Sequence, residues 1–415
     1  MSGRLPVPKS GSDPAQRSPG AAPVVAAPQA RRAVATCLLI VAQAAVWLVV
    51  RRYLVVGSDW MRFATRPDTL DCFGLLVGPF IHIEAAHLGM NVLALWLFGA
   101  NLERAIGSLR FLGLYLGSAA FASLMHWATA VCFHLYSDAP AAGMAVGSSG
   151  AVAGVLGAVW VRFSQDRLSV PLATRWTFPA TPLFALWFVY TLSQAVLTTL
   201  AGVSQGIGHW AHFAGFTFGL GVAQFLRMPR EARAEYLERA AARATETNDL
   251  AGAAQAWAAL LAMSPEDLKV RAALVSTRLA MEDSAGARRL AREGIEHPVR
   301  AEHRCPALEA YRVFRPLIPD VRLPPGVRYR LGCWLADDGE GELAIRTLLE
   351  SVREDGATGA SASALFRAGE VAETRLQNQN RARILWERLL EQFPDSPWAA
   401  QAQERLRILP WRPKA

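Results

Sequence analysis

Residues 207–226 read IGHWAHFAGFTFGLGVAQFL, an apolar run that contains two histidines. A helix of about 20 such residues crosses the hydrocarbon core of a membrane, which is about 30 Å thick. Ala211, Gly215 and Gly219 recur at every fourth position, and small residues on one helix face let a second helix approach closely. Imidazole groups at membrane depth usually face a bundle interior or a water-filled cavity. The run therefore predicts a packed membrane helix beside a polar site.

Five more apolar runs precede this one. The six candidate spans cover residues 33–56, 86–104, 109–134, 146–163, 180–201 and 207–226. Backbone groups in lipid must be hydrogen-bonded internally, so each run is expected to be a helix. The segment 57–85 is too mixed to span and is expected to lie partly in the membrane interface. The sequence predicts an all-α fold whose residues 33–228 form a polytopic six-helix transmembrane bundle.

Positively charged residues give the expected orientation of this bundle. Links on the cytoplasmic side of a membrane carry an excess of Lys and Arg. If all six spans cross, one side receives Arg31, Arg32, Arg104, Arg110, Arg162, Arg167, Arg175, Arg227 and Arg230. Residues 51–66 are the exception, because they contain four arginines but are expected on the opposite side. We expect an integral, multi-pass protein of a bacterial inner membrane with both termini in the cytoplasm. The net charge of +8 then comes largely from arginines at the ends of the apolar runs, so no nucleic acid partner is expected.

Three of the spans place polar side chains at one expected depth. The fourth opens with Gly147-Ser148-Ser149-Gly150, and the sixth carries His212 near its start. The second opens near His87 and Asn91, which share a helix face because they are four residues apart. Peptide hydrolysis needs a nucleophile, a base and donors to an oxyanion, and these groups supply all three. The plainer interpretation, a glycine packing face with incidental polar residues, stays open on these residues alone.

The ordered set of motifs resembles the rhomboid family of intramembrane serine proteases. The set comprises His82-x4-His87-x3-Asn91, Gly99-x3-Glu103-x3-Gly107-Ser108-x-Arg110-Phe111, Gly147-Ser148-Ser149-Gly150 and Ala211-His212-x-Ala214-Gly215. Each motif is weak alone, but their order and spacing agree over residues 82–219.

The resemblance implies a Ser–His dyad in a water-filled cavity, with Ser149 as nucleophile and His212 as general base. It implies that His87, Asn91 and the Ser149 backbone N–H donate to the oxyanion. The expected substrates are single-span membrane proteins, cut in or near their transmembrane segments, and membrane lipid surrounds the bundle. No cofactor and no metal is expected. The alternative function is an inactive rhomboid-like protein that binds or escorts membrane clients. A transporter or assembly scaffold is disfavoured, because the spans show no internal repeat.

Several positions depart from the family pattern. Ala153 stands four residues after Ser149, where rhomboids often place an aromatic that stacks on the histidine, and this leaves the support of His212 open. Trp60-Met61-Arg62 is an imperfect match to a Trp-Arg pair of the first loop, and Gly219 is the candidate for a further glycine of the last motif.

Other titratable residues allow alternatives that the sequence disfavours. His209 and His212 have an HxxH spacing that could share a zinc ion, but the zincin pattern HExxH is absent from the sequence. His126 and His134 match no motif and are expected in packing or loop positions. Cys72 and Cys132 are both expected on the outer side, where a disulfide between them is conceivable.

The flanking regions differ from the bundle in composition. Residues 1–32 are rich in Pro, Ala, Gly and Ser and are expected to form a disordered cytoplasmic tail. Residues 229–410 are expected to form a soluble helical-repeat domain. Two of its stretches, 249–265 and 380–394, resemble the second helix of a tetratricopeptide repeat, while residues 298–360 fit that pattern poorly. Such repeats expose a concave binding surface, so a cytoplasmic protein partner is expected there. A generic helical bundle is the alternative.

Overall fold

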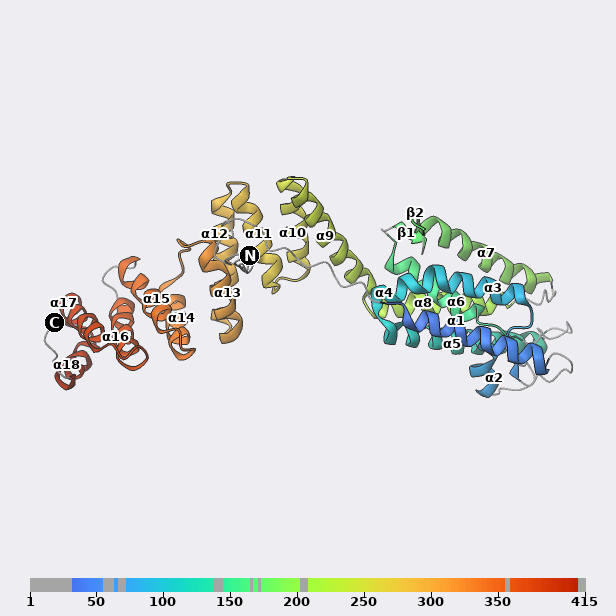
Figure 1. Ribbon diagram of the computed structural model, residues 1–415, viewed down its shortest axis with the longest axis horizontal. Coiled ribbons are helices and arrows are strands. Elements are labelled where there is room, and N and C mark those ends of the chain that lie inside the picture. Colours follow the sequence, from blue (N-terminus) through green and yellow to red (C-terminus); the bar gives the residue numbers. More distant parts are fainter. Residues whose placement is uncertain are drawn as a thin grey trace, which may run out of the picture. The chain divides into compact units, whose positions relative to one another are not determined.

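A computed structural model describes residues 32–54, 63–65, 72–136, 145–164, 167–170, 173–201, 208–354 and 359–409. The chain divides into two compact units, the bundle unit Ala26–Glu235 and a repeat unit that contains Tyr236–Ala415 (Figure 1). The division falls inside one helix, α9 (Met228–Glu246). Residues 1–31 of the predicted tail (1–32) and the Trp60-Met61-Arg62 sequence lie outside the described residues.

The bundle unit is built of apolar helices. They are α1 (Val34–Val49) with its π-helical extension η1 (Val50–Leu54), α2 (Cys72–Val77) with the 3₁₀ turn η3 (Gly78–Phe80), the continuous series α3 (Ala85–Ala94), η4 (Leu95–Gly99) and α4 (Ala100–Ile106), then α5 (Ser108–Tyr136), α6 (Ser149–Arg162), α7 (Ala180–Ala201) and α8 (His209–Phe225). Leucines and valines on the outer faces of α1 and α7 are exposed, as expected for lipid-facing surfaces.

Four helices of the described chain are long and apolar enough to cross a membrane. They are Val34–Arg52, Ala85–Ile106, Ser108–Cys132 and Thr181–Ala201. The other two predicted spans are also helices, but α6 has 14 residues and α8 has 17. By length and composition, the predicted count of six spans is therefore not confirmed. The reason in α6 is that the helix begins only at Ser149, because Ala145 first pairs with Thr65 in an extended bridge and Gly147 then turns with φ of 110°.

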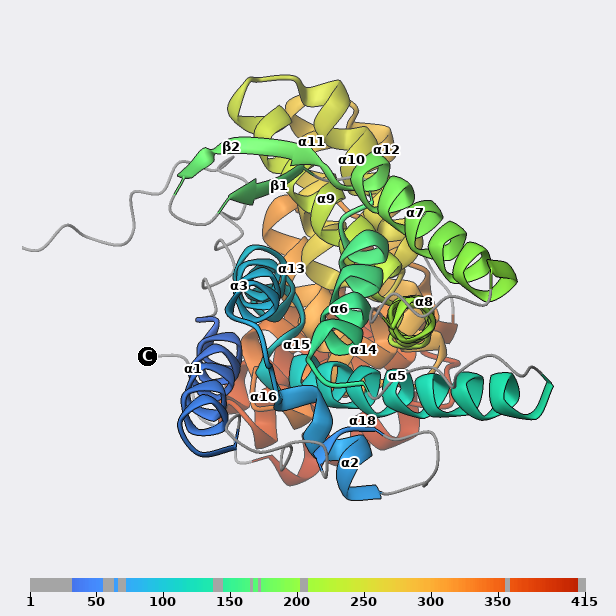
Figure 2. The same ribbon diagram turned by 90° about the vertical axis from the view of Figure 1, so that its right-hand side faces the viewer.

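Helix α6 lies at the centre of the bundle unit, where it packs against α5, α7, α8 and the η4 turn (Figure 2). Its glycines make the contact with α8 very close. A Cβ atom at Gly215 or Gly219 would overlap the carbonyl oxygen of Gly150 or Gly154, and a Cβ at Gly157 would overlap that of Phe216. The small-residue faces predicted on the fourth and sixth spans therefore meet each other.

Glu103 ties the second span to the first. Its carboxylate is fully buried and accepts hydrogen bonds from Ala35 N (2.8 Å), Thr36 N (2.7 Å), Thr36 Oγ1 (2.7 Å) and Ser108 Oγ (2.6 Å). Backbone N–H groups at a helix start lack partners within the helix, and a negative charge there also complements the helix dipole. The glutamate of the second-span motif thus caps α1.

The link between the fourth and fifth predicted spans contains a two-stranded antiparallel sheet. Strands β1 (Arg167–Val170) and β2 (Ala173–Pro179) pair with Arg167 opposite Pro179. This hairpin was not expected in an all-α fold. A signal for it was present in the sequence, since Thr174, Trp176, Thr177 and Phe178 are residues that favour strands.

Two ion pairs join one end of the bundle to the start of α9. Arg162, the last residue of α6, is buried and lies 2.6 Å from Glu235, and Arg110 near the start of α5 lies 3.2 Å from Glu231. The C-terminal end of α6 and the N-terminal end of α5 therefore lie at the same end of the bundle unit. Ser149, at the opposite end of α6, lies toward the other end.

The repeat unit is a series of antiparallel helices. After α9 these are α10 (Leu250–Met263), α11 (Leu268–Ala280), α12 (Ser284–Arg300), α13 (Arg304–Leu317), α14 (Pro325–Asp337), α15 (Gly341–Glu354), α16 (Gly359–Thr374), α17 (Gln379–Gln392) and α18 (Ala399–Ile408). Asp249, Asp267, Asp283 and Asn378 cap helix starts through side-chain oxygens. Residues 298–360 fit the repeat pattern poorly in sequence. Their described part nevertheless includes the helices α13, α14 and α15, which share one apolar core with the neighbouring helices.

Candidate active site

The structure brings Ser149 and His212 together. Ser149 is the first residue of α6, and His212 lies in the first turn of α8, so both are near the ends of their helices. His212 Nε2 lies 2.7 Å from Ser149 Oγ, and both side chains are half-buried. This is a hydrogen-bonding distance between a hydroxyl and an imidazole. The close glycine contact between α6 and α8 is what holds the two groups within reach.

The two neighbouring serines have different environments. The Ser148 hydroxyl is fully buried and donates a hydrogen bond to Oε1 of Gln43, at 2.7 Å. Gln43 belongs to α1 and is also fully buried. The Ser148 hydroxyl also lies 3.2 Å from His82 Nε2. Ser149 differs from it by contacting His212 and by staying partly accessible. Sequence reasoning did not find Gln43, because no local pattern marks one glutamine in an apolar run.

Trp187 of α7 provides an aromatic neighbour for His212. Ala153 is buried and offers only a methyl group at the position where rhomboids often have an aromatic. The Trp187 ring lies 6.4 Å from the His212 ring, with 37° between their planes, and 5.3 Å from the Phe216 ring. The aromatic next to the histidine thus comes from a different helix. The sequence could not reveal this, since Trp187 sits in an apolar run without a motif.

His87 lies over the backbone segment that leads into Ser149. A Cβ atom at Gly147 would be 3.0 Å from His87 Nε2 and would overlap the ring's Cε1, so a larger residue would require the imidazole to move. Gly147 also has φ of 110°, which glycine adopts without strain, and its N–H donates to Gly78 O at 3.0 Å. His87, which the sequence predicted as an oxyanion donor, thus lies against Gly147, two residues before Ser149.

Asn91 is placed behind His87 and is fully engaged in hydrogen bonds. Its amide nitrogen lies 3.2 Å from His82 Nε2 and donates to the His87 carbonyl oxygen at 3.1 Å. An oxyanion role for Asn91, as the sequence suggested, requires one of these N–H groups to be released. His82, which carried no predicted role, is buried and accepts from the Ser148 backbone N–H at 3.3 Å. It links Asn91 to the nucleophile segment.

The remaining candidates of the sequence take other places. The His209 ring packs edge-on to His212 at 6.2 Å, and within the described residues no group of three His, Cys, Asp or Glu could hold a metal ion. His126 is buried on α5 against Gly208, whereas the side chain of His134 is outside the described residues. Cys132 has a free thiol, and the side chain of Cys72 is not among those described.

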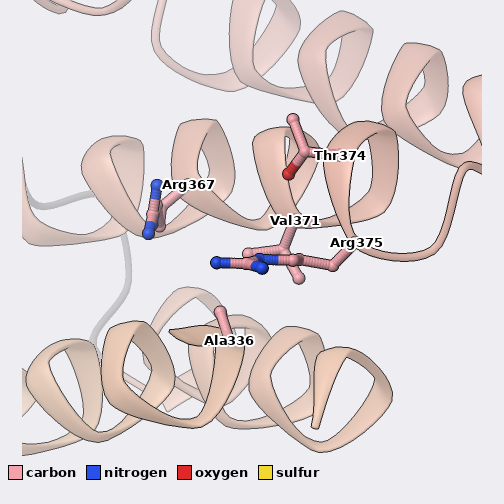
Figure 3. A pocket seen from close by; sticks show the side chains of 5 residues that line it. All are labelled: Ala336, Arg367, Val371, Thr374 and Arg375. Atoms are coloured by element: carbon pink, nitrogen blue, oxygen red, sulfur yellow. The ribbon is translucent and has the colours of Figure 1, made fainter. Parts of the chain in front are cut away.

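A separate pocket lies in the repeat unit, between α14 and α16. It has a volume of about 200 Å³ and is lined by Ala336, Arg367, Val371, Thr374 and Arg375 (Figure 3). Both guanidinium groups are also near Asp337 of α14, at 3.5 Å from Arg367 and 3.8 Å from Arg375. The lining of the pocket therefore contains two guanidinium groups, each of which is also near the carboxylate of Asp337.

Comparison with known proteins places the bundle unit in context. Residues 70–229 match the family model described as the Rhomboid domain. The bovine presenilin-associated rhomboid-like protein, mitochondrial, is 26% identical over 156 residues, which cover 36% of this chain and 37% of that protein. The rhomboid protease GluP of Bacillus subtilis (strain 168) is 40% identical over 116 residues, 28% of this chain and 18% of that protein. The chain spans about a third or less of the length of these curated relatives.

Among solved structures, the chain is similar to the crystal structure of YrrB, a TPR protein with an unusual peptide-binding site. The two are 17% identical in sequence, with coverage of 42% of this chain and 91% of that chain and a TM-score of 0.22. The family assignment rests on the bundle unit. Residues 70–229 match the Rhomboid domain and contain the ordered motifs, and four helices of the described chain are long and apolar enough to cross a membrane.

Proposed function

We propose that the protein is an intramembrane serine endopeptidase that hydrolyses peptide bonds in or near transmembrane segments. The observation that carries the proposal is the 2.7 Å contact between Ser149 Oγ and His212 Nε2, made by two helices distant in sequence. A protein that only binds or escorts membrane clients, the alternative function, has no need of this contact.

The chemistry follows from the two groups. As the Ser149 oxygen attacks the scissile carbonyl carbon, its proton passes to His212 Nε2. The tetrahedral intermediate carries its negative charge on the former carbonyl oxygen. On its collapse the C–N bond breaks, and His212 returns the proton to the leaving amine. A water molecule, deprotonated by the same imidazole, then attacks the carbonyl carbon of the acyl–Ser149 ester. The ester C–O bond breaks, His212 returns the proton to the Ser149 oxygen, and the second product leaves as a carboxylic acid.

The oxyanion needs donors near Ser149. The Ser149 backbone N–H lies at the start of α6, where N–H groups have no partner within the helix and the helix dipole favours negative charge. The His87 ring, which lies against Gly147, is a predicted side-chain donor. Asn91 joins them when its bond to His82 opens. Removal of one donor of this kind typically costs about 10²–10³ in turnover.

The shortness of α6 supports cleavage below one membrane surface. Its 14 residues rise about 21 Å, less than the hydrocarbon thickness of about 30 Å. If Arg162 lies at the cytoplasmic face, then Ser149 lies within the membrane rather than at its outer face. We therefore propose single-span membrane proteins as substrates, with access from the surrounding lipid. The arginines at the Arg162 end support cytoplasmic termini.

The cellular membrane is a separate question from topology. The expectation of a bacterial inner membrane remains a proposal, and the mitochondrial name of the bovine relative weighs against it. The partner protein expected on the repeat unit is likewise a proposal. It is supported by the polar pocket between α14 and α16, where Arg367 and Arg375 could bind carboxylate groups.

The test uses the full chain in liposomes with a single-span reporter that has a helix-destabilising transmembrane segment. Wild type is compared with Ser149→Ala, His212→Ala and the control Ser193→Ala, whose hydroxyl on α7 bonds only the local Tyr190 carbonyl among its described contacts. We expect cleavage by wild type and Ser193→Ala, and losses on the order of 10⁶-fold in the other two. Equal cleavage by all four proteins would reject the proposal.

A further inference from the structure

A buried hydrogen-bonded chain runs from α1 to the residue beside the candidate nucleophile. Gln43 Oε1 accepts the Ser148 hydroxyl hydrogen at 2.7 Å, and neither side chain is exposed. Gln43 precedes residues 70–229, the part of the chain that matches the Rhomboid domain. The bond spans 105 positions in sequence and fixes α1 to the turn that carries Ser149.

The chain continues to His82 and Asn91. His82 Nε2 has one lone pair, and three groups lie near it: the Ser148 N–H at 3.3 Å, the Asn91 amide at 3.2 Å and the Ser148 hydroxyl at 3.2 Å. The first two can only donate, so this nitrogen acts as an acceptor. The hydroxyl hydrogen must therefore point elsewhere, and Gln43 Oε1 is the acceptor that receives it.

Loss of the glutamine carbonyl would change this arrangement. The Ser148 hydroxyl would be left as a buried donor without its acceptor, which is unfavourable. One remaining acceptor is His82 Nε2, 3.2 Å away, where the hydroxyl would compete with the Ser148 N–H and the Asn91 amide. The turn before Ser149 and the orientation of Asn91 would both shift as a result.

We propose that Gln43 is a positioning residue for the reaction. By taking the Ser148 hydroxyl hydrogen, it fixes the segment that carries Ser149 and leaves His82 to orient Asn91. The inference rests on the proposed function of Ser149, and it adds a contribution from α1, which the resemblance to rhomboids did not assign. A purely structural bond between α1 and α6 is the competing explanation.

The test compares Gln43→Leu with Thr36→Val in the full chain. Thr36 is a matched control because it is buried on the same helix and hydrogen-bonded to Glu103, away from Ser149. Three quantities are measured for each protein: the rate constant for labelling of Ser149 by a fluorophosphonate, kcat and KM with the membrane reporter, and the midpoint of thermal unfolding in detergent. Rates are normalised to the folded fraction.

We expect Gln43→Leu to lower the labelling rate constant and kcat by roughly 10- to 100-fold, since small displacements of a reacting group have effects of this size. KM should stay within about twofold of wild type, because substrate binding is not the property lost. Thr36→Val should lower the unfolding midpoint while its labelling rate stays close to wild type.

A double-variant cycle separates positioning from general loosening of the bundle. If Gln43 acts through Ser148, then Gln43→Leu and Ser148→Ala together should slow labelling no more than the slower single variant. Additive losses, or a Gln43→Leu protein that labels as fast as Thr36→Val, would overturn the inference and leave the proposed function standing. Wild-type protein that is not labelled at Ser149 would overturn both.

Discussion

At the scale of single residues, the orientation of the His212 ring decides whether Nε2 faces Ser149. Ala153 cannot hold the ring by stacking, because a methyl group has no aromatic face. Trp187 lies 6.4 Å from the imidazole and is itself packed against Phe216. A tilted aromatic contact of this kind restricts the ring while leaving its edge free for hydrogen bonds. Trp187 of α7 thus provides the aromatic support for His212 that Ala153 cannot give.

This argument predicts that Trp187→Leu lowers activity. Aromatic contacts contribute about 0.5–1.5 kcal/mol beyond area burial, so labelling of Ser149 by a fluorophosphonate should slow by roughly 2- to 10-fold. Trp160→Leu is the control, because Trp160 packs on Phe188 and Phe216 and has no described ring contact with His212. Equal slowing in both variants would show that Trp187 acts only through the general packing of α7.

The sequence could supply Ser149 and His212 but not the residues that support them. The two candidates stand in short motifs whose order along the chain is informative. Gln43 and Trp187 lie in apolar runs, and their roles depend on contacts with residues far away in sequence, such as the bond from Gln43 to Ser148. Tertiary packing alone brings these groups together, so no local pattern could have named them.

At the scale of elements, the close approach of α6 and α8 was predictable and the start of α6 was not. Glycines at four-residue spacing on both spans indicated a close helix contact, and the structure has it. The first turn of α6 was misplaced because the sequence of residues 146–148 is as apolar and small as the helix that follows. Ala145 instead pairs with Thr65, and Gly147 and Ser148 form a bend and a turn before the helix begins.

The contact between α6 and α8 predicts different effects on labelling and stability when two glycines of α8 are replaced by alanine. A Cβ at Gly215 would overlap the Gly150 carbonyl oxygen, whereas a Cβ at Gly221 meets nothing within 4 Å. Gly215→Ala should therefore push the helices apart, cost about 1–3 kcal/mol, and slow Ser149 labelling on the order of 10²-fold. Gly221→Ala should label like wild type and fold at least as well, since alanine favours helices. Normal labelling of Gly215→Ala would contradict a packing role for that glycine.

At the scale of the whole molecule, composition predicted two units, one apolar and one rich in charged residues. Apolar runs end near residue 226, and charged helices with Asp and Asn caps follow, which is the pattern of a soluble helical array. The sequence was less informative over residues 298–360, where prolines at 298 and 316 interrupt the repeat pattern. In the structure both prolines lie inside helices, and the apolar core runs through this region without a break.

The contacts divide the chain into two compact units. A substitution that destabilises the repeat unit should therefore leave the candidate active site intact. Trp386 is fully buried in α17, donates to the Phe366 carbonyl at 3.2 Å and fills the space beside Gly369. Trp386→Ala should cost about 3–5 kcal/mol and lower the unfolding midpoint of the repeat unit on the order of 10 °C. Ile384→Ala, on the same helix but 57% exposed, is the control and should change little. Below either midpoint, Ser149 should be labelled at the same rate in both variants. A parallel fall in labelling with Trp386→Ala would mean that the bundle unit depends on the repeat unit for its active geometry.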